Sequence, residues 1–511
     1  MIWILDFIFT PMAKRLMYGF CLSALIFMVT SCHTSSKNFN AAKKFPAASL
    51  RKDYTLLREI MERFHPALYW YTPKDSMDYY FNKYYNAITD SMTLQQFGFT
   101  ILAPLTTKVR CGHTSFNYPP RYNKWQHKHD QPSFPLFMKI WGDTMVLTVN
   151  LNKQDTVLKS GTLINSVNGL SVQQLTDTLF QFMPADGYSE NVNYIRISAA
   201  FPYYHRNIMG LSKKYVVGYT DSTGLQKSDT VPLFDPNTDS VARKFIRSRN
   251  KQIEPKQKPE KWEDIRSMTI DTAHQMAVMI VNSFGNKGRL PAFYKKSFKT
   301  LRKKNIPNLV IDLRGNGGGK VNNYTSLAKY VRNTPFKVAD TAVAMHHGLA
   351  HYNRYFRSGL INSLILFFVT KKKEDGEYHF SYWEKHVFEP RKKNHYKGNV
   401  FVLINGPTFS ASTLFAHTVK GQSNVTLVGE EAGGGWHGNS GILIPNVVLP
   451  KTKIRVRMPL FRLVQYNHVP KDGRGVMPDI YVPPTVENVR KGIDGKMKKV
   501  IDIIEASSTA Q

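Results

Sequence analysis

Four short apolar runs in the second half of the chain place the strongest constraint on its fold. They are Met276-Ala-Val-Met-Ile-Val281, Leu309-Val-Ile-Asp-Leu313, Val400-Phe-Val-Leu-Ile404 and Val425-Thr-Leu-Val428. Each run has the length of a strand, and helical stretches separate several of them. This pattern is typical of an α/β domain with a largely buried sheet. Ligands of such domains bind beyond the carboxyl ends of the strands, so we expect the functional site at the turns that follow these runs.

The first half of the chain has a different pattern. At 511 residues the whole chain is long enough for two or three domains. Residues 50–125 open with apolar side chains at three- and four-residue steps, which predicts an N-terminal helical domain. Residues 130–235 change to short β-type runs, with a strong turn signal at Asn168-Gly169. This β-rich segment resembles a PDZ-like domain, and the resemblance implies that it accepts an extended peptide end by strand addition.

A charged stretch at residues 245–266 predicts a linker, and we expect the α/β core over residues 267–490. An insertion at residues 344–396 interrupts this core. It carries an apolar run from Leu360 to Val369, followed by Lys371-Lys-Lys373. The run is shorter than the roughly 20 residues that cross a bilayer. We expect an ordinary buried segment; a cap over the site and a surface that touches lipid are the alternatives.

Residues 1–31 have the features of an export signal. Two basic residues precede an apolar run from Met17 to Val29, and the run ends at Thr30-Ser31-Cys32. This ending resembles the lipobox of bacterial lipoproteins. The resemblance implies cleavage before Cys32, acylation of its thiol, and a polar tether over residues 32–49. We therefore expect a lipoprotein of the cell envelope that is anchored to a membrane and faces the periplasm.

The formal charge of +32 restricts the partners less than its size suggests. Lys and Arg are spread along the chain without a nucleic-acid-binding motif, so we expect no nucleic-acid partner. A basic surface favours anionic membranes, acidic substrates or a free peptide carboxylate. Of three cysteines, Cys21 leaves with the signal and Cys32 is lipidated, which leaves Cys111 as a lone thiol that we expect in the core.

Two turns carry the candidate catalytic residues. Asp312-Leu-Arg314-Gly-Asn316-Gly-Gly318-Gly319 ends one predicted strand, and Asn405-Gly-Pro-Thr-Phe-Ser410-Ala-Ser412 ends another and opens a helix. A serine at a helix N-terminus lies beside unpaired backbone N–H groups and the positive end of the helix dipole. The glycine run adds N–H groups that can approach a substrate closely, as an oxyanion hole requires.

These turns resemble the D-x-R-x-N-x-G-G and S-A-S motifs of the tail-specific, or C-terminal processing, serine peptidases, which include the tricorn core peptidase. A closing G-x-x-P-D motif matches Gly475-Val-Met-Pro478-Asp479. The resemblance implies a ClpP/crotonase-like α/β catalytic core in a multidomain chain. It also implies that Ser410 is the nucleophile and that the N–H groups of Gly318 and Ala411 form the oxyanion hole.

The general base departs from the best-known branch of that family, which uses a lysine in the glycine-rich stretch after the nucleophile helix. Here residues 429–438 contain no lysine, and a serine hydroxyl needs some base to accept its proton. The Gly112-His113-Thr114 segment resembles the position from which the tricorn-like branch supplies a histidine, so His113 is predicted as the base. Asp472 matches the position of the third residue, with Glu430 and Glu431 as alternatives.

Other kinds of site have weaker support. The glycine run lacks the spacing of a phosphate loop, and the serine is not in a G-x-S-x-G turn. His347 and His351 lack the H-E-x-x-H pattern of a zinc site, so neither a metal nor an organic cofactor is expected. We predict a serine endopeptidase that acts near the C-termini of unfolded or flexible proteins. The alternatives are an inactive binding or scaffold protein on the same fold, and an esterase or amidase with a non-protein substrate.

Overall fold

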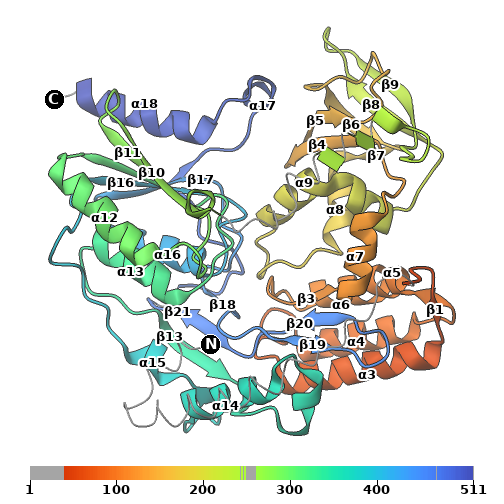
Figure 1. The fold of residues 1–511 in the computed structure, drawn as a ribbon, viewed down its shortest axis with the longest axis horizontal. Helices are drawn as coiled ribbons and strands as arrows, with labels where there is room; N and C mark the ends of the chain where they lie inside the picture. Colours follow the sequence, from red (N-terminus) through yellow and green to blue (C-terminus); the bar gives the residue numbers. More distant parts are fainter. Residues whose placement is uncertain (1–38, 242, 245–246, 249–260, 468, 510–511) are drawn as a thin grey trace.

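A six-stranded sheet forms the centre of the C-terminal half (Figure 1). In spatial order its strands are β10 (Arg266–Asp271), β11 (Met276–Val281), β12 (Asn308–Asp312), β16 (Asn399–Ile404), β17 (Val425–Gly429) and β22 (Ile480–Tyr481). Strand β10 is antiparallel to β11, and the other pairs are parallel. The four apolar runs in the sequence are therefore strands of one sheet, and the predicted α/β core is confirmed.

Helices bury both faces of this sheet, which explains why its strands are apolar at successive positions. Helices α12 (Leu290–Lys303), α13 (Val321–Val331) and α16 (Ala411–Val419) cover one face, where Leu309 and Ile311 lie. Helix α18 (Gly495–Thr509) covers the other face through Val500 and Ile504, which pack with Val310. Alternate side chains of β12 point to opposite faces, and each finds an apolar partner.

The structure is a computed structural model that describes residues 39–241, 243–244, 247–248, 261–467 and 469–509. The predicted signal, Cys32 and most of the predicted linker lie outside the described residues. The part of the linker that is described holds α11 (Trp262–Ile265) and the first residue of β10.

Residues 130–235 form an antiparallel sheet with two helices. The strands follow the order β4 (Leu136–Trp141), β5 (Thr144–Asn150), β6 (Leu163–Val167), β8 (Lys214–Thr220) and β9 (Gln226–Pro232), with β7 (Leu170–Ser171) paired to β6. Helices α8 (Val172–Phe180) and α9 (Asn191–Ile208) pack on this sheet. The expected β-rich segment is present, and its PDZ-like character stays a prediction.

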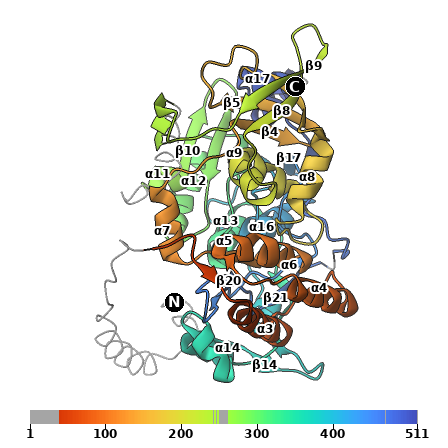
Figure 2. The same cartoon turned by 90° about the vertical axis from the view of Figure 1, so that its right-hand side faces the viewer.

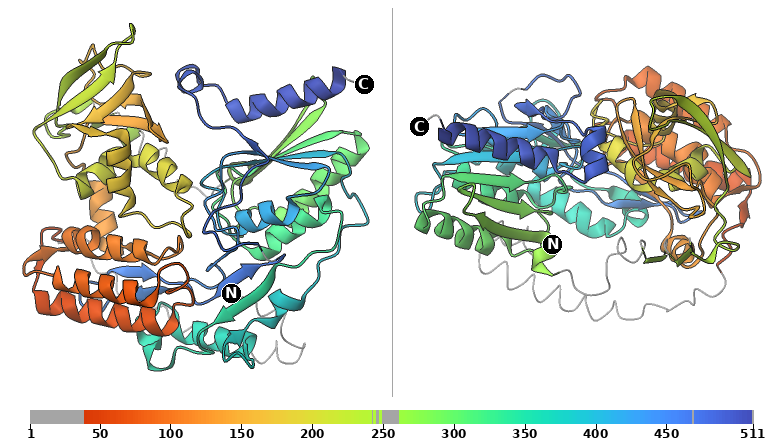
Figure 3. Two further views of the ribbon diagram at one scale, coloured as in Figure 1. Left: turned by 180° about the vertical axis from the view of Figure 1, so that it is seen from behind. Right: turned by 90° about the horizontal axis from the view of Figure 1, so that it is seen from above.

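The N-terminal helices share their core with segments from much later in the chain. They are α3 (Ala47–Phe64), α4 (Lys74–Asn86), α5 (Leu94–Gln96), a π-helix at Phe97–Leu102, α6 (Ala103–Lys108) and α7 (Pro120–Lys128), and a short pair joins β1 (Lys44–Phe45) to β2 (Met92–Thr93). Strand β3 (Ser115–Asn117) pairs with β20 (Arg455–Arg457), which pairs with β19 (Asn446–Val448). Figures 2 and 3 show how these late strands reach across to the N-terminal helices.

The insertion adds two strands, β14 (Lys371–Lys372) and β15 (Tyr378–His379), to a second small sheet and carries a peripheral helix. The sheet has the order β14, β15, β13 (Ala339–Ala344), β21 (Arg462–Gln465) and β18 (Gly438–Asn439). A 3-10 helix (Ala350–Tyr355), α14 (Gly359–Val369) and α15 (Ser381–Lys385) complete it, and α17 (Val486–Lys491) follows the core.

The apolar run of the insertion forms α14, but the expectation that it is buried is wrong for one face of this helix. Leu360, Leu364 and Phe367 are 70%, 57% and 59% exposed. Among the described residues, no helix combines the length and apolar character needed to span a bilayer.

Candidate active site

The nucleophile turn joins β16 to α16 and holds Ser410 in an unusual backbone conformation. Ser410 has φ 56° and ψ −122°, a region that costs a non-glycine residue of order 1–3 kcal/mol and is found mostly at functional sites. The neighbouring turn fixes this geometry, because the Phe409 N–H donates to the Asn316 carbonyl (3.1 Å) and Thr408 Oγ1 donates to the Leu313 carbonyl (3.0 Å). The two turns therefore meet at the carboxyl ends of the adjacent strands β12 and β16, as expected.

Gly318 lies directly against the nucleophile. A Cβ at Gly318 would be 2.7 Å from Ser410 Cβ and 3.0 Å from Ala411 N, and its φ of +102° also favours glycine. Ala411 is the first residue of α16, and its N–H has no hydrogen-bond partner within the described part of the chain. The Gly318 N–H, in contrast, donates to Asn316 Oδ1 (2.9 Å). Of the two predicted oxyanion donors, Ala411 is free and Gly318 is engaged within its own turn.

The structure brings Ser410 and His113 together at Gly441. A Cβ built on Gly441 would lie 3.2 Å from Ser410 Oγ and 3.3 Å from His113 Nε2, so both atoms face the same small space. The same point lies 2.8 Å from Asn439 Oδ1. Asn439 is buried and its Nδ2 has no partner among the described residues, so the sequence prediction missed a polar group at the site. No motif in the sequence marked it.

His113 is positioned by contacts on both sides of its loop. The residue lies between α6 and β3, and its ring packs on the Phe409 ring with 4.7 Å between centroids. Next to it, Thr114 Oγ1 is 2.7 Å from His65 Nε2. Since the Ala67 N–H donates to His65 Nδ1, His65 Nε2 carries the proton and donates to Thr114. The imidazole is thus held between the nucleophile turn and the N-terminal helices.

The His113 imidazole is uncharged in this conformation. Burial, and then the nearby charges of Arg457 and Arg196, lower the pKa of His113 to about 3. The imidazole is therefore neutral at pH 7 with a ring nitrogen open to a proton, and a pKa this far below 7 makes it a weak base in this conformation. Its Nδ1 is buried and has no hydrogen-bond partner among the described residues.

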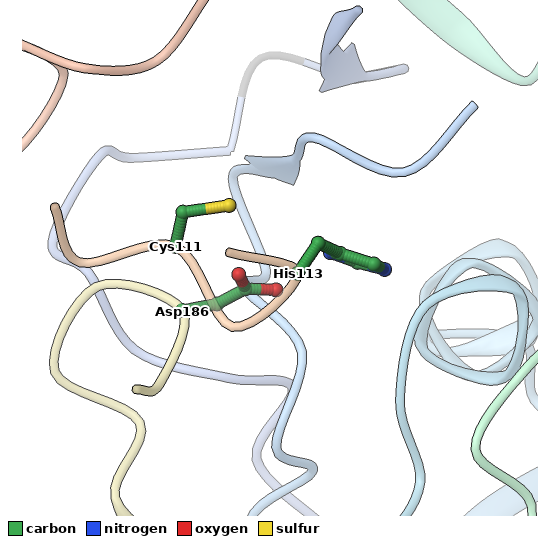
Figure 4. Close-up of side chains that lie close together, drawn as sticks. All are labelled: Cys111, His113 and Asp186. Atoms are coloured by element: carbon green, nitrogen blue, oxygen red, sulfur yellow. The ribbon is translucent and has the colours of Figure 1, made fainter. Parts of the chain in front are cut away.

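A buried carboxylate that the sequence did not reveal lies beside His113 (Figure 4). The Cys111 Sγ, a ring nitrogen of His113 and a carboxylate oxygen of Asp186 all lie within 4.8 Å of one another. Asp186 accepts hydrogen bonds from the Gly112 N–H (2.7 Å) and the Gly435 N–H (3.3 Å). Burial raises its pKa to about 6, and these hydrogen bonds oppose that rise. The Asp186-Gly187 pair signals only a turn in the sequence.

The acids named from the sequence have other partners. Asp472 is exposed and accepts the Arg474 N–H (2.8 Å), and no hydrogen bond joins it to His113. Glu431 accepts from Arg474 Nη2 (2.6 Å) and from the backbone at residue 475. Glu430 pairs with Lys496 Nζ (2.7 Å). The structure thus brings none of these three carboxylates to the His113 imidazole as a hydrogen-bond partner.

The cluster of Cys111, His113 and Asp186 includes side-chain types that bind zinc. The thiol is poorly suited to this role, because burial raises the pKa of Cys111 to about 12 and a metal ligand must be the thiolate. Cys111 is a buried free cysteine, as the sequence predicted. A second group, Asp375, Glu377 and His379, lies in the insertion.

The remaining motif residues stabilise the turns. Asp312 receives two side-chain hydrogen bonds from Arg314, which also binds Asp494 at 2.7 Å. Asp479 accepts the Leu427 N–H at 2.8 Å and pairs with Lys420. These interactions fix the sheet edge on which the two turns stand.

Comparison with known proteins agrees with this geometry. Residues 275–482 match Peptidase family S41. The core is a peptidase S41 domain. It contains Ser410, Gly318 and Ala411, whereas His113 and Asp186 lie outside it. The domain identifies the chain as a serine-type peptidase, a hydrolase.

Solved structures resemble nearly the whole chain. Mature CPAF complexed with lactacystin has a TM-score of 0.61 and 13% identity over 90% of this chain and 98% of its own. The photosystem II D1 C-terminal processing protease has a TM-score of 0.39 and 14% identity over 88% of this chain and 98% of its own. The tricorn protease has a TM-score of 0.36 and 13% identity over 90% of this chain and 37% of its own. At this identity the similarity to CPAF shows a shared fold. No curated protein sequence matches the chain.

Proposed function

We propose that this S41 peptidase is an endopeptidase that cleaves near the C-termini of unfolded or flexible proteins through an acyl-enzyme. Ser410 is the nucleophile and His113 the general base. The observation that carries the proposal is the meeting of Ser410 Oγ and His113 Nε2 at Gly441. A neutral imidazole and a strained serine at a helix N-terminus are suited to this chemistry.

The proposed reaction follows from the positions of these groups. His113 Nε2 takes the Ser410 hydroxyl proton while Oγ attacks the scissile carbonyl carbon, and the free Ala411 N–H stabilises the oxyanion. The protonated imidazole then gives its proton to the leaving amine, and a water molecule hydrolyses the ester. Gly318 adds a second donor only when its N–H leaves Asn316 Oδ1, so the glycine turn must shift as substrate binds.

Asp186 is our choice for the third residue, in place of Asp472. It is buried beside His113, and it holds the His113 loop through the Gly112 N–H. A carboxylate here stabilises the imidazolium that forms when His113 accepts the serine proton. Since Asp186 makes no hydrogen bond to Nδ1 in this conformation, we assign it as a positioning residue.

The location and the route of substrate delivery are further proposals. We infer that acylation of Cys32 anchors the chain to a membrane of the cell envelope, with the peptidase facing the periplasm, because residues 14–32 match a lipoprotein signal. The β-rich segment at residues 130–235 is proposed as a PDZ-like domain that presents substrate ends by strand addition.

Covalent labelling of the full chain with a fluorophosphonate tests the site. The wild type and Ser412→Ala should label, whereas Ser410→Ala should not, and His113→Ala should label at least ~10²-fold more slowly. His347→Gln, in the insertion, is the matched histidine control. A folded wild type that neither labels nor cleaves denatured protein would support an inactive binding protein. Labelling with cleavage of esters but not of peptides would support an esterase or amidase.

A further inference from the structure

A cavity of about 310 Å³ lies beside the loop that carries His113. Gly112 and Ser115, which flank that loop, are part of its wall, together with residues of α7, α9 and β20. Two of the wall residues are arginines: Arg196 on α9 and Arg457 on β20. None of the lining residues is acidic.

We propose that this cavity, which we call the two-arginine pocket, binds a carboxylate of the peptide substrate next to the Ser410–His113 pair. Arg196 Nη1 donates to the Pro184 carbonyl (2.7 Å) and to Asn193 Oδ1 (2.9 Å), which fixes one side of its guanidinium. The Arg457 side chain forms no hydrogen bond or ion pair with the described residues, and its backbone pairs with Ser115 and Asn446 in the sheet. Neither guanidinium forms an ion pair in this part of the chain, and the Asp186 carboxylate acts on Arg196 only at longer range, so donors are available to a ligand.

The rest of the wall is suited to a ligand with an apolar body and an anionic end. Its aromatic side chains are Phe99, Phe116, Tyr118, Phe182, Tyr203 and Tyr204. Asn117, Asn123 and Gln126 add neutral polar groups. Arginine binds carboxylates through two parallel hydrogen bonds, and such pairs gain strength where water is partly excluded. A side chain or chain end of a peptide meets this description.

The chain offers a contrast that supports this assignment. Other arginines around the site are already paired: Arg314 with Asp312 and Arg474 with Glu431. Burial lowers the pKa of Arg196, and the nearby charge of Arg457 lowers it further, while Tyr204 and Asp186 oppose this shift. A partly buried guanidinium without an ion pair favours the binding of an anionic ligand. The carboxylate has two sources, the α-carboxylate of the chain end and an Asp or Glu side chain, and both have the chemistry that the pocket recognises.

The test rests on the proposed peptidase function and keeps the two ideas separable. A proteome-derived peptide library gives the preferred cleavage sequence of the full-length wild type. That peptide is then made with a free or amidated C-terminus, and with each acidic residue replaced by its amide. For the wild type, we expect kcat/KM to be about 10- to 100-fold lower on one of these neutral peptides than on the parent acidic peptide. For Arg457→Gln, we expect the same loss on the acidic peptide and no further loss on the neutral one. Arg457→Lys should recover part of it, and Lys451→Gln, on the same hairpin, should match the wild type.

Each outcome has a definite meaning. If the peptide with the amidated C-terminus has the lower kcat/KM, the pocket binds the chain end. If a peptide with an amide in place of an acidic side chain has the lower kcat/KM, the pocket binds that side chain. Either result supports the proposal. Urea unfolding and circular dichroism of Arg457→Gln show whether this variant is folded, independently of its reactivity. If the wild type labels and cleaves but neutral and acidic peptides react equally, the pocket proposal is refuted. If the wild type neither labels nor cleaves, the peptidase function itself fails.

The exposed face of α14 carries a second, independent inference: the structure points to contact with an anionic bilayer. Leu360, Leu364 and Phe367 follow one another at steps of four and three, so they share one face of the helix. Leu366 and Asn362 on the other side are buried. Helix α14 lies at the periphery of the molecule (Figures 1 and 2). Contiguous exposed apolar surface on such a helix is unusual without a partner.

The charges around α14 indicate which partner it fits. Exposed basic residues lie just before the helix, at Arg354 and Arg357, and just after it, at Lys371 and Lys372. An apolar helical face between basic groups is typical of helices that lie in the interface of anionic membranes. A helix of this length lies on the bilayer and does not cross it.

A local probe tests this surface on the full chain. With Cys21 and Cys32 changed to Ser, and with Cys111 buried and protonated, an NBD fluorophore is attached at Leu364→Cys. Vesicles containing phosphatidylglycerol should shift its emission to the blue and raise its intensity several-fold. Phosphatidylcholine vesicles should do so much less, and the same probe at Tyr79→Cys, an exposed position on α4, should not respond. No response at position 364, or a response to protein concentration in place of vesicles, would refute the membrane assignment.

Discussion

Gly441→Ala should inactivate the enzyme while it leaves the fold intact. The added methyl group would lie 3.2 Å from Ser410 Oγ, 3.3 Å from His113 Nε2 and 2.8 Å from Asn439 Oδ1. The contact with Asn439 is too close, so that side chain must shift, and the methyl group then occupies the space that the nucleophile and its base both face. General-base catalysis contributes roughly 10²–10⁴-fold. We therefore expect kcat/KM and the rate of fluorophosphonate labelling to fall by about 10²–10³-fold.

The stability of Gly441→Ala should change little. Alanine reduces the entropy of the unfolded chain and stabilises the fold by about 0.4–1 kcal/mol, while the tight contact costs about 1–3 kcal/mol. Urea unfolding measures the balance. The matched control is Gly348→Ala in the insertion, whose new methyl group would lie 3.2 Å from Ser363 Oγ, a similar contact far from the site. If Gly441→Ala labels within twofold of the wild type, Ser410 and His113 do not react across this space.

Three further predictions concern neighbouring groups. Gly318→Ala should lower kcat by about 10²–10³-fold, because its Cβ would strike Ser410 Cβ at 2.7 Å and displace the oxyanion donors; unchanged steady-state kinetics would contradict this. The folded state raises the pKa of Asp186 to about 6, so wild-type stability falls as pH rises from about 4 to 6. Relative to wild type, Asp186→Asn should gain about 3 kcal/mol between pH 4 and pH 8 in urea unfolding, and a pH-independent difference would refute this. Lys496→Met should cost about 3–5 kcal/mol by leaving Glu430 buried and unpaired, and Glu430→Gln in the same chain should restore most of it in thermal unfolding.

The sequence predicted the core of the site because its signals were local. A strand followed by a glycine-rich or serine-rich turn can be read from a few residues, and parallel strands bring such turns to one edge. Ser410 and Gly318 were therefore expected to meet, and they do. His113 was inferred from a family motif alone, and its place beside Ser410 depends on packing between segments far apart in the chain.

Groups without a local signal were missed. Asp186 lies in a loop whose sequence indicates only a turn. Asn439 is a polar residue in a glycine-rich stretch and belongs to no motif. Their proximity to His113 and Ser410 depends on how the β-rich segment and the second small sheet dock on the core. The exposure of α14 was also misjudged, because an apolar run shows that surface is available for burial but not which partner covers it.

The pairing of β3 with β20 bears on when the enzyme becomes active during its synthesis. A ribosome makes residues 115–117 early and residues 455–457 almost last, so the strand that follows His113 waits for its partner through most of translation. A nascent chain that stops before β20 holds both Ser410 and His113 but lacks the strand that seats the histidine. We therefore expect the peptidase to be inactive while it is being synthesised, and to become able to cleave a substrate only when the chain is nearly complete.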